Sequence, residues 1–275
     1  MKRLMRFAVA VVAAVGLAVP VGSAAVAGPA SSGHARFSAL VFSRTAAFRH
    51  DSIPAGVAAI RQLGARHHFT VDATEDAGAF TDANLARYDV VVWLSTTGDV
   101  LNDAQQAAFE RYIRAGGGYA GIHAASDTEY DWAWYGGLVG AYFRDHPGSV
   151  NAQFQVATVK VLGHDTAATR PLPRRWEREE EWYNFRTNPR DTVRVLAEVD
   201  ERTYDPRGYS VPGGSPGMGR HHPVSWCQPF DGGRVFYTAL GHKAEYYAEP
   251  LLLAHLLGGI RMAAGVTRFN CGHED

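Results

Sequence analysis

Excess charge and long apolar segments are both scarce in this chain of 275 residues. The formal net charge is −1 at pH 7 and no stretch is rich in lysine or arginine, so the sequence offers no electrostatic basis for binding nucleic acid. Beyond the first residues, no apolar stretch is long enough to cross a bilayer, which argues against a stable membrane anchor. Internal repeats and recognisable linkers are also lacking, which favours one large domain.

Cysteine is nearly absent, since Cys227 and Cys271 are the only two. Their spacing matches no zinc motif. An even pair in an exported protein favours a disulfide, and two buried thiols are the alternative.

The start of the chain predicts a secretory signal peptide rather than part of the fold. Positive charges come first, an apolar run over residues 7–19 follows, and a small-x-small cleavage site ends at Ala27. The run is too short for a membrane span, although an uncleaved anchor is the alternative. We therefore expect residues 1–27 to be removed, residues 28–36 to form a disordered N-terminus, and the secreted protein to begin near Gly28.

The rest of the sequence alternates between strand and helix patterns. Hydrophobic residues make up 46% of the chain, enough for a sizeable core. Short connections between alternating strands and helices predict a mostly parallel sheet with helices on both faces. The expected strands in the first half of the chain are residues 37–43, 69–73, 89–95 and 119–122, with helices beginning near Ser52 and Asn102.

After residue 127 the pattern becomes more varied. Residues 132–143 are aromatic and glycine-rich with helical character, and residues 251–264 predict a closing helix. A long Gly- and Pro-rich loop covers residues 204–222, and such loops inside a compact domain tend to be functional or mobile. Further strands are expected at residues 151–162, 192–199, 224–228 and 234–240.

Several of the twelve histidines follow the ends of predicted elements. His50, His123 and His242 each come after a strand, and His146 lies beside Asp and Pro. The stretch GGGYAGIHAAS, residues 116–126, indicates a strand that enters a sharp turn with His123 at its tip. Ligands bind at the carboxyl ends of parallel strands, so we expect these histidines to meet at one rim. There they could transfer protons or bind a metal, whereas the alternative for any one of them is a structural histidine.

The acidic run EREEEWYNF, residues 177–185, allows two interpretations. Adjacent carboxylates repel each other, which favours a solvated edge strand. Alternatively, Glu180 or Glu181 points into an aromatic pocket, where burial would raise its pKa and suit it to acid–base work. Tyr183 could then orient a sugar hydroxyl.

Six motifs in order resemble the trehalose-utilisation (ThuA-like) family, whose fold is like that of the class I glutamine amidotransferases. The resemblance implies a flavodoxin-like α/β fold, a ThuA-like domain over residues 37–264 and a C-terminal tail over residues 265–275. The motifs are FRHDSI (Phe48 to Ile53), GGYAGIHAASDT (Gly117 to Thr128), FRDHP (Phe143 to Pro147), EEWYNF (Glu180 to Phe185), HPVSW (His222 to Trp226) and GRVFYTALGH (Gly233 to His242).

The resemblance also bears on the chemistry at the turn. In the amidotransferases the residue at this position is a nucleophilic Cys, and His123 replaces it here, which removes the acyl-enzyme route. His242 stands where those enzymes have their catalytic His. Glutaminase activity is therefore not expected. The family is associated with disaccharides and with sugars oxidised to the 3-keto form, in which the hydrogen at C2 is acidic enough for a base to remove.

We therefore expect a secreted carbohydrate-metabolism enzyme that acts on a disaccharide or glycoside, including 3-keto derivatives, by His/Glu acid–base chemistry as a hydrolase, lyase or isomerase. Its partner would be a small carbohydrate, and a divalent metal bound by His50, His123 and His242 is the one candidate cofactor. The alternatives are a metal-dependent hydrolase and a non-catalytic sugar-binding module with an aromatic rim that includes Trp132, Trp134 and Trp182. The expected catalytic residues are His123, His242, Glu181 and Glu180, and the expected substrate-binding residues are His50, Asp127, His146, Tyr183 and Trp226.

Overall fold

The computed structural model describes residues 37–272. The expected signal peptide and the N-terminal segment up to residue 36 lie outside the described residues. Within them, no helix has the length and apolar character needed to cross a membrane.

A nine-stranded sheet with the order β2-β1-β3-β4-β11-β10-β9-β6-β7 forms the centre of the fold. Its first five strands run parallel to one another. Their order is that of the flavodoxin-like folds, with β11 in the fifth place. The predicted α/β, flavodoxin-like fold is therefore confirmed. The parallel strands are β1 (Ser38–Phe42), β2 (Thr70–Thr74), β3 (Val90–Leu94), β4 (Gly118–Ile122) and β11 (Gly233–Thr238).

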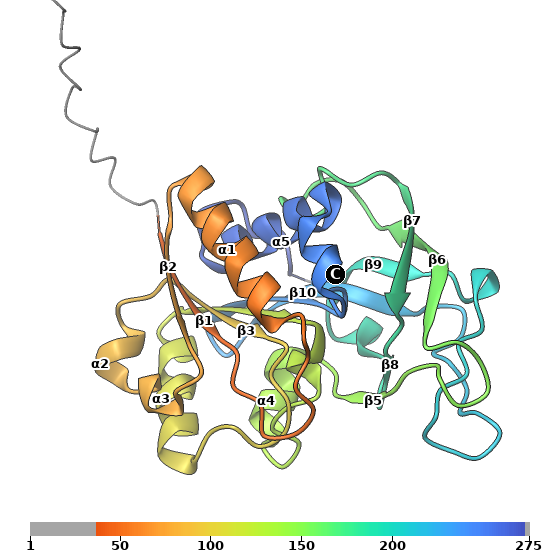
Figure 1. Cartoon of the computed structure of the whole chain (residues 1–275). Coiled ribbons are helices and arrows are strands. Elements are labelled where there is room, and N and C mark those ends of the chain that lie inside the picture. The colour runs from red at the N-terminus through yellow and green to blue at the C-terminus, as the bar shows by residue number, and fades with distance from the viewer. Residues whose placement is uncertain (1–36, 273–275) are drawn as a thin grey trace, which may run out of the picture. The chain divides into compact units, whose positions relative to one another are not determined.

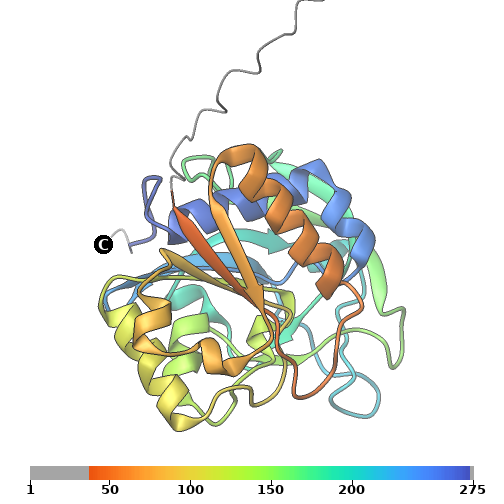
Figure 2. The same cartoon turned by 60° about the vertical axis from the view of Figure 1, so that its left-hand side comes forward.

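Helices cover both faces of the sheet (Figures 1 and 2). One face carries α1 (Ile53–His67) and α5 (Pro250–Ala263), and the other carries α2 (Asp82–Leu85), α3 (Asp103–Arg114) and α4 (Ala133–Val139). Local sequence fixes the helix starts, because α1 has a proline in its first turn and Asn102 forms a capping box with Gln105 at the start of α3. Residues 132–143 are helical only in part, since the helix ends at Val139 and a short strand, β5 (Phe143–Asp145), follows.

The second half of the sheet is antiparallel, and its edge strand approaches the carboxyl ends of the parallel strands. Its strands are β10 (Pro223–Phe230), β9 (Arg194–Val199), β6 (Phe154–Val161) and β7 (Arg175–Glu181). Five strand spacings separate β7 from β4 in the sheet order, which is about 24 Å in a flat sheet. Yet Glu181 at the end of β7 lies 3.5 Å from His123 beyond β4, Oε2 to Nε2. The sheet therefore curls. Strand β10 carries register shifts around Ser225, and irregularities of this kind bend a strand.

Two connections fix the C-terminal part of the chain. Cys227 on β10 and Cys271 in the tail are joined by a disulfide, with their Cα atoms 5.5 Å apart. The long loop over residues 204–222 is anchored by the buried Asp145, which accepts hydrogen bonds from the Asn184 side chain and from the backbone N–H of Ser210. Part of this loop therefore has a defined position beside β5.

Candidate functional site

Three histidine-bearing loops meet at the carboxyl edge of the parallel strands. His50 follows β1, His123 follows β4 and His242 follows β11. The Nε2 atom of His123 lies 3.2 Å from Nε2 of His50 and 3.1 Å from Nδ1 of His242. Residues far apart in the sequence thus form one cluster because parallel strands end at the same edge.

His123 occupies the tip of the turn with a left-handed backbone, φ 52°. A positive φ at a residue other than glycine is strained, and such strain is common where a side chain must be held at a functional site. Its Nδ1 lies 2.7 Å from the carbonyl oxygen of Ala239, which can only accept, so Nδ1 carries the proton and donates. In the neutral ring Nε2 therefore presents a lone pair to the cluster.

The His123 ring is fully buried. His50, His242 and Tyr183 surround its Nε2, with the Tyr183 hydroxyl 3.0 Å away. Hence His123 forms part of the pocket floor and has no direct access to solvent.

Glu181 joins the cluster from the edge strand β7. Its Oε2 lies 2.8 Å from Nδ1 of His242, and its Oε1 lies 3.1 Å from Nε2 of His146 and accepts a hydrogen bond from Gln153. Burial alone would raise the pKa of Glu181, but the neighbouring rings of His123 and His242 outweigh burial and hold the pKa well below its usual range. Glu181 does point into the pocket, as one interpretation of the acidic run had it. The raised pKa expected for such a glutamate is wrong.

Glu180 has a different environment from the one expected for a catalytic residue. Its buried carboxylate accepts hydrogen bonds from Arg178 at 2.9 Å, from the backbone N–H of Gly241 at 2.9 Å and from that of His242 at 3.3 Å. Glu180 does not line the pocket, so the structure assigns it a positioning role: it fixes the turn that carries His242. Its neighbour Glu179 instead pairs with Lys243 and is about 42% exposed.

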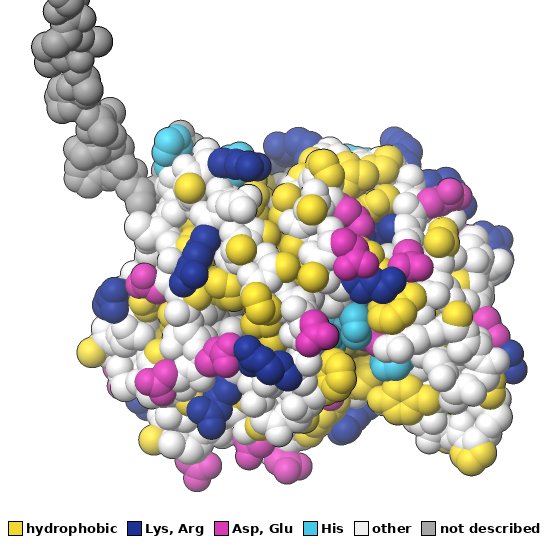
Figure 3. All heavy atoms as spheres, viewed as in Figure 1, with side chains coloured by type: hydrophobic (Ala, Val, Ile, Leu, Met, Phe, Trp, Pro, Cys, Tyr) yellow, Lys and Arg dark blue, Asp and Glu magenta, His cyan; other side chains and the backbone are white. Residues whose placement is uncertain are grey.

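A pocket of about 240 Å³ opens above the cluster. Histidine side chains reach the surface near the middle of the face shown in Figure 3, bordered by hydrophobic side chains. This volume is below the range of about 300–1,000 Å³ typical of drug-sized ligands, so the pocket suits one small ring. The lining residues are Phe48, His50, Asp127, Phe143, His146, Gln153, Glu181, Tyr183, Tyr209 and His242.

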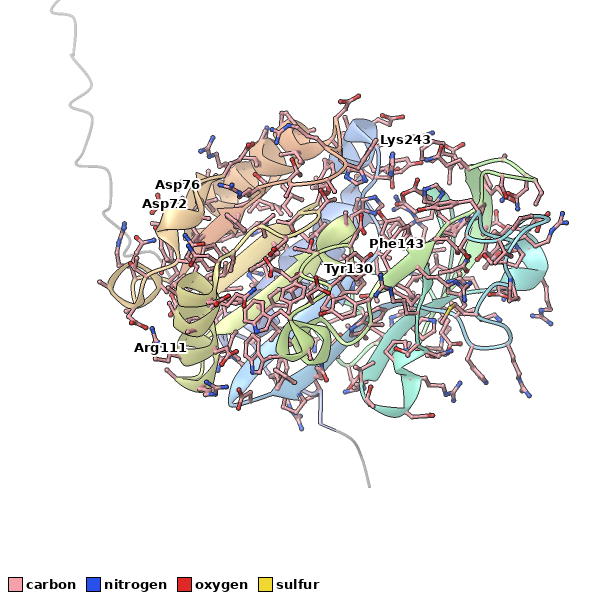
Figure 4. The ribbon with its side chains drawn as sticks, turned by 90° about the horizontal axis from the view of Figure 1, so that it is seen from below. Asp72, Asp76, Arg111, Tyr130, Phe143 and Lys243 are labelled. Atoms are coloured by element: carbon pink, nitrogen blue, oxygen red, sulfur yellow. A yellow bond between two sulfur atoms is a disulfide. The ribbon has the colours of Figure 1, made fainter. Side chains whose placement is uncertain are left out.

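Asp127 and His146 are the carboxylate and the imidazole of the lining that lie outside the cluster of His50, His123, His242 and Glu181. Burial raises the pKa of Asp127, partly offset by a hydrogen bond from the hydroxyl of Tyr130 at 2.5 Å. Tyr130 also reaches the carbonyl of Phe143 at 3.1 Å, and Figure 4 shows these two residues side by side. Both ring nitrogens of His146 face acceptors, since Nδ1 lies 2.6 Å from the carbonyl oxygen of Pro147 and Nε2 lies 3.1 Å from Oε1 of Glu181.

The tryptophans expected to form an aromatic rim do not line the pocket. Trp226 is fully buried and donates from its indole nitrogen to the carbonyl of Val139, so its predicted substrate-binding role is wrong. Trp132 and Trp182 are buried as well, and Trp134 bonds to Asp231 in the turn before β11, at the opposite end of the parallel strands. These side chains follow a simpler rule, that large aromatic residues next to apolar strands usually pack into the core.

Sequence reasoning missed several lining residues. Tyr209 belongs to the long loop whose composition did indicate function, and Phe48 and Phe143 lie inside quoted motifs without a role assigned to them. Gln153 carried no signal, because its position depends on how the sheet curls.

A larger cavity, of about 810 Å³, lies elsewhere, beside β6 and β9. Its charged side chains largely neutralise one another: Asp200 pairs with both Arg202 and Lys160, and Glu198 pairs with His221. We therefore place the functional site in the smaller pocket, where three histidines and Glu181 from separate elements converge in one buried cluster.

The four residues beneath the pocket, called the floor cluster from here on, could also bind a metal ion. His50, His123, His242 and Glu181 each offer one ligand atom, and these atoms all lie within 4.8 Å of one another. Burial, together with the neighbouring His123 and His242, lowers the pKa of His50 to about 2, so that ring is neutral at physiological pH. Neutral imidazole is the form that binds metals.

The sequence matches the family described as ThuA, trehalose utilisation, over residues 38–263. No curated protein matches it.

Solved structures resemble the fold closely. A ThuA-like protein from Bacteroides uniformis ATCC 8492 superimposes with a TM-score of 0.68 at 23% identity, covering 85% of this chain and 94% of that one. A ThuA-like protein from Parabacteroides merdae ATCC 43184 gives 0.66 at 18% identity, covering 84% and 91%. A β-galactosidase from Bacillus circulans sp. alkalophilus gives 0.51 at 13% identity, covering 82% of this chain but 31% of that one. At these identities the likeness concerns the fold alone.

Proposed function

The chain belongs to the ThuA (trehalose utilisation) family, and from that premise we propose that it is an enzyme that acts on a disaccharide or another glycoside, in particular a 3-keto derivative, in the pocket above the histidine cluster. The observation that carries this proposal is the set of groups around one small pocket. Asp127 and His146 offer a proton acceptor and a proton donor, and buried polar atoms form the floor between them.

Asp127 is suited to act as the general base. Burial raises its pKa, so its carboxylate is a stronger base than an exposed aspartate. The C2 hydrogen of a 3-keto sugar is acidified by the adjacent carbonyl, and a carboxylate of this kind is adequate to remove it.

His146 is suited to act as the general acid. Its Nε2 lies 3.1 Å from Oε1 of Glu181, which orients the ring, and histidine is the side chain that most often transfers protons in enzymes. The proton would pass to the glycosidic oxygen as the C1–O bond breaks. The electron pair from the C2–H bond then forms a C1–C2 double bond, which gives an unsaturated keto sugar and a free alcohol.

The floor cluster would stabilise the negative charge that develops on the C3 oxygen. Preorganised hydrogen-bond donors in a water-poor site are effective at this task, and the Tyr183 hydroxyl reaches the floor. Burial also raises the pKa of Tyr183 well above its usual value, so it stays protonated and can donate.

The pocket size limits what can bind. About 240 Å³ suits one sugar ring, so the second ring of a disaccharide would project toward solvent past Tyr209 and Phe48. The disulfide between Cys227 and Cys271 supports the expectation that the protein works outside the cytoplasm.

The test is a screen of native and 3-keto disaccharides for alcohol or sugar release, followed by kinetics on the best substrate. Asp127→Asn should lower kcat by about 10²–10⁴-fold, which is the usual contribution of a general base. Asp131→Asn, four residues further along and exposed, is the matched control and should turn over normally. In deuterated water, recovered substrate should carry deuterium at C2, because the enolate can take up a deuteron there before the C1–O bond breaks.

Two results would count against the proposal. Normal turnover by Asp127→Asn would remove the base assigned here. Tight binding of sugars without turnover of any native or keto glycoside would favour a non-catalytic sugar-binding protein.

A further inference from the structure

We propose that His50, His123, His242 and Glu181 form a binding site for one divalent transition-metal ion of the zinc class at the floor of the pocket. This inference goes beyond the sugar chemistry and does not depend on it, because metal binding is measured without a substrate.

The spacing of the donor atoms fits a small ion. Two ligands at about 2.0–2.1 Å from a tetrahedral zinc ion lie about 3.3–3.4 Å apart. From Nε2 of His123, the distances are 3.2 Å to Nε2 of His50, 3.1 Å to Nδ1 of His242 and 3.5 Å to Oε2 of Glu181. All four donor atoms lie within 4.8 Å of one another, close enough to surround a single ion.

The facing ring nitrogens of His123 and His50 do not have enough protons to form a satisfied set of hydrogen bonds. Nδ1 of His123 donates to Ala239, so its Nε2 has only a lone pair to offer, and Nε2 of His50 faces that lone pair. If Nε2 of His50 carries the proton, its Nδ1 is left without a partner, and Nδ1 is a buried atom with no hydrogen bond. If it does not, two lone pairs face each other. A cation between the rings would bind both lone pairs, and Nδ1 of His50, which lacks a hydrogen-bond partner in each case, would then carry the proton of the ring.

The surroundings of the cluster match those of known kinds of metal site. A metal-binding histidine usually donates its other ring nitrogen to a carbonyl or carboxylate, and a metal-binding carboxylate is hydrogen-bonded in turn. His123 donates to the carbonyl of Ala239. The second oxygen of Glu181 is held by His146 and Gln153.

The donor set also selects the class of ion. Three imidazoles and one carboxylate suit zinc, iron, nickel or copper, whereas magnesium and calcium prefer oxygen ligands. His242 is about 16% exposed on the pocket side, so an ion bound here could also meet a ligand from the pocket. It would then act as a Lewis acid toward a carbonyl oxygen.

The test is calorimetric titration of the chelator-treated full-length protein with Zn²⁺, supported by the visible spectrum of bound Co²⁺. The wild type should bind one equivalent tightly. Glu181→Gln keeps the side-chain size and His242→Ala removes a partly exposed ring, and each should weaken binding by about 100-fold or more, the upper end of what even supporting residues contribute. His67→Ala, in the last turn of α1 and outside the cluster, is the control for surface histidines and should bind like the wild type.

Circular dichroism of each variant separates a lost ligand from a lost fold. If the wild type binds no Zn²⁺ beyond what weak surface sites take up, or if Glu181→Gln and His242→Ala, correctly folded, bind it as the wild type does, the proposal is overturned and shared protons stabilise the cluster instead. A negative sugar screen with one tight zinc equivalent would overturn only the proposed function.

Discussion

Replacing Glu180 by glutamine should destabilise the fold by about 3 kcal/mol. Removing one partner of a buried ion pair usually costs about 3–5 kcal/mol, because the other charge stays buried without its partner. Here the partner is Arg178, only 3% exposed, with its Nη2 2.9 Å from Glu180. The loss should fall at the lower end, because Glu249 also pairs with Arg178 and the amide oxygen of glutamine can still accept from Gly241.

Glu179→Gln provides a matched control in the same strand. Glu179 pairs with Lys243 at the surface, where an ion pair contributes about 0.2–1 kcal/mol. Urea unfolding followed by tryptophan fluorescence would give both free energies of unfolding. Equal losses in the two variants would refute the view that Glu180 is a structural anchor. Crystals of Glu180→Gln should also show a displaced turn at Gly241 and His242, since two backbone N–H groups lose a charged acceptor.

Three further predictions concern stability. Cys271→Ala should lose about 4 kcal/mol in urea unfolding, the loop-entropy value for a sequence separation of 44, and reduction of the wild type should give a similar loss. Burial lowers the pKa of His255 from 6.5 to about 4, so the unfolded chain binds the proton at a higher pH than the folded protein does. As the pH falls from 6.5 to 4, the free energy of unfolding should therefore drop by about 3 kcal/mol. His255→Gln should make this pH dependence weaker. Gly208→Ala should lower the melting temperature and speed proteolysis of the surrounding loop, because a Cβ there would lie 2.1 Å from the carboxylate of Asp145; an unchanged Tm would contradict this contact.

The parallel half of the fold could be predicted from the sequence because its signals are local. Apolar runs such as residues 89–95 form strands that are buried on both faces, and short connections leave few possible topologies. Once the strands are parallel, the positions just beyond them share one edge. That is why His50, His123 and His242 could be grouped without a structure.

The rest of the site depends on long-range geometry that no local pattern contains. Glu180 and Glu181 are neighbours in one acidic run, yet one anchors a turn and the other faces the pocket, and only the path of β7 decides which does which. Burial of Trp226 and of His123 likewise depends on which segments pack over them. The sequence indicated the residue types of the site but not their exposure.

The curl of the sheet determines how far Glu181 lies from the histidines of the pocket. The parallel strands supply the histidines, and the opposite edge supplies the carboxylate that faces them. A substitution near Ser225 that flattened the sheet by a small angle would draw Glu181 away from the cluster, although it touched no residue of the pocket. The antiparallel half of the sheet thus sets the distance between Glu181 and the histidines. Variants that change its curl would change the geometry of the site without altering a residue of the pocket.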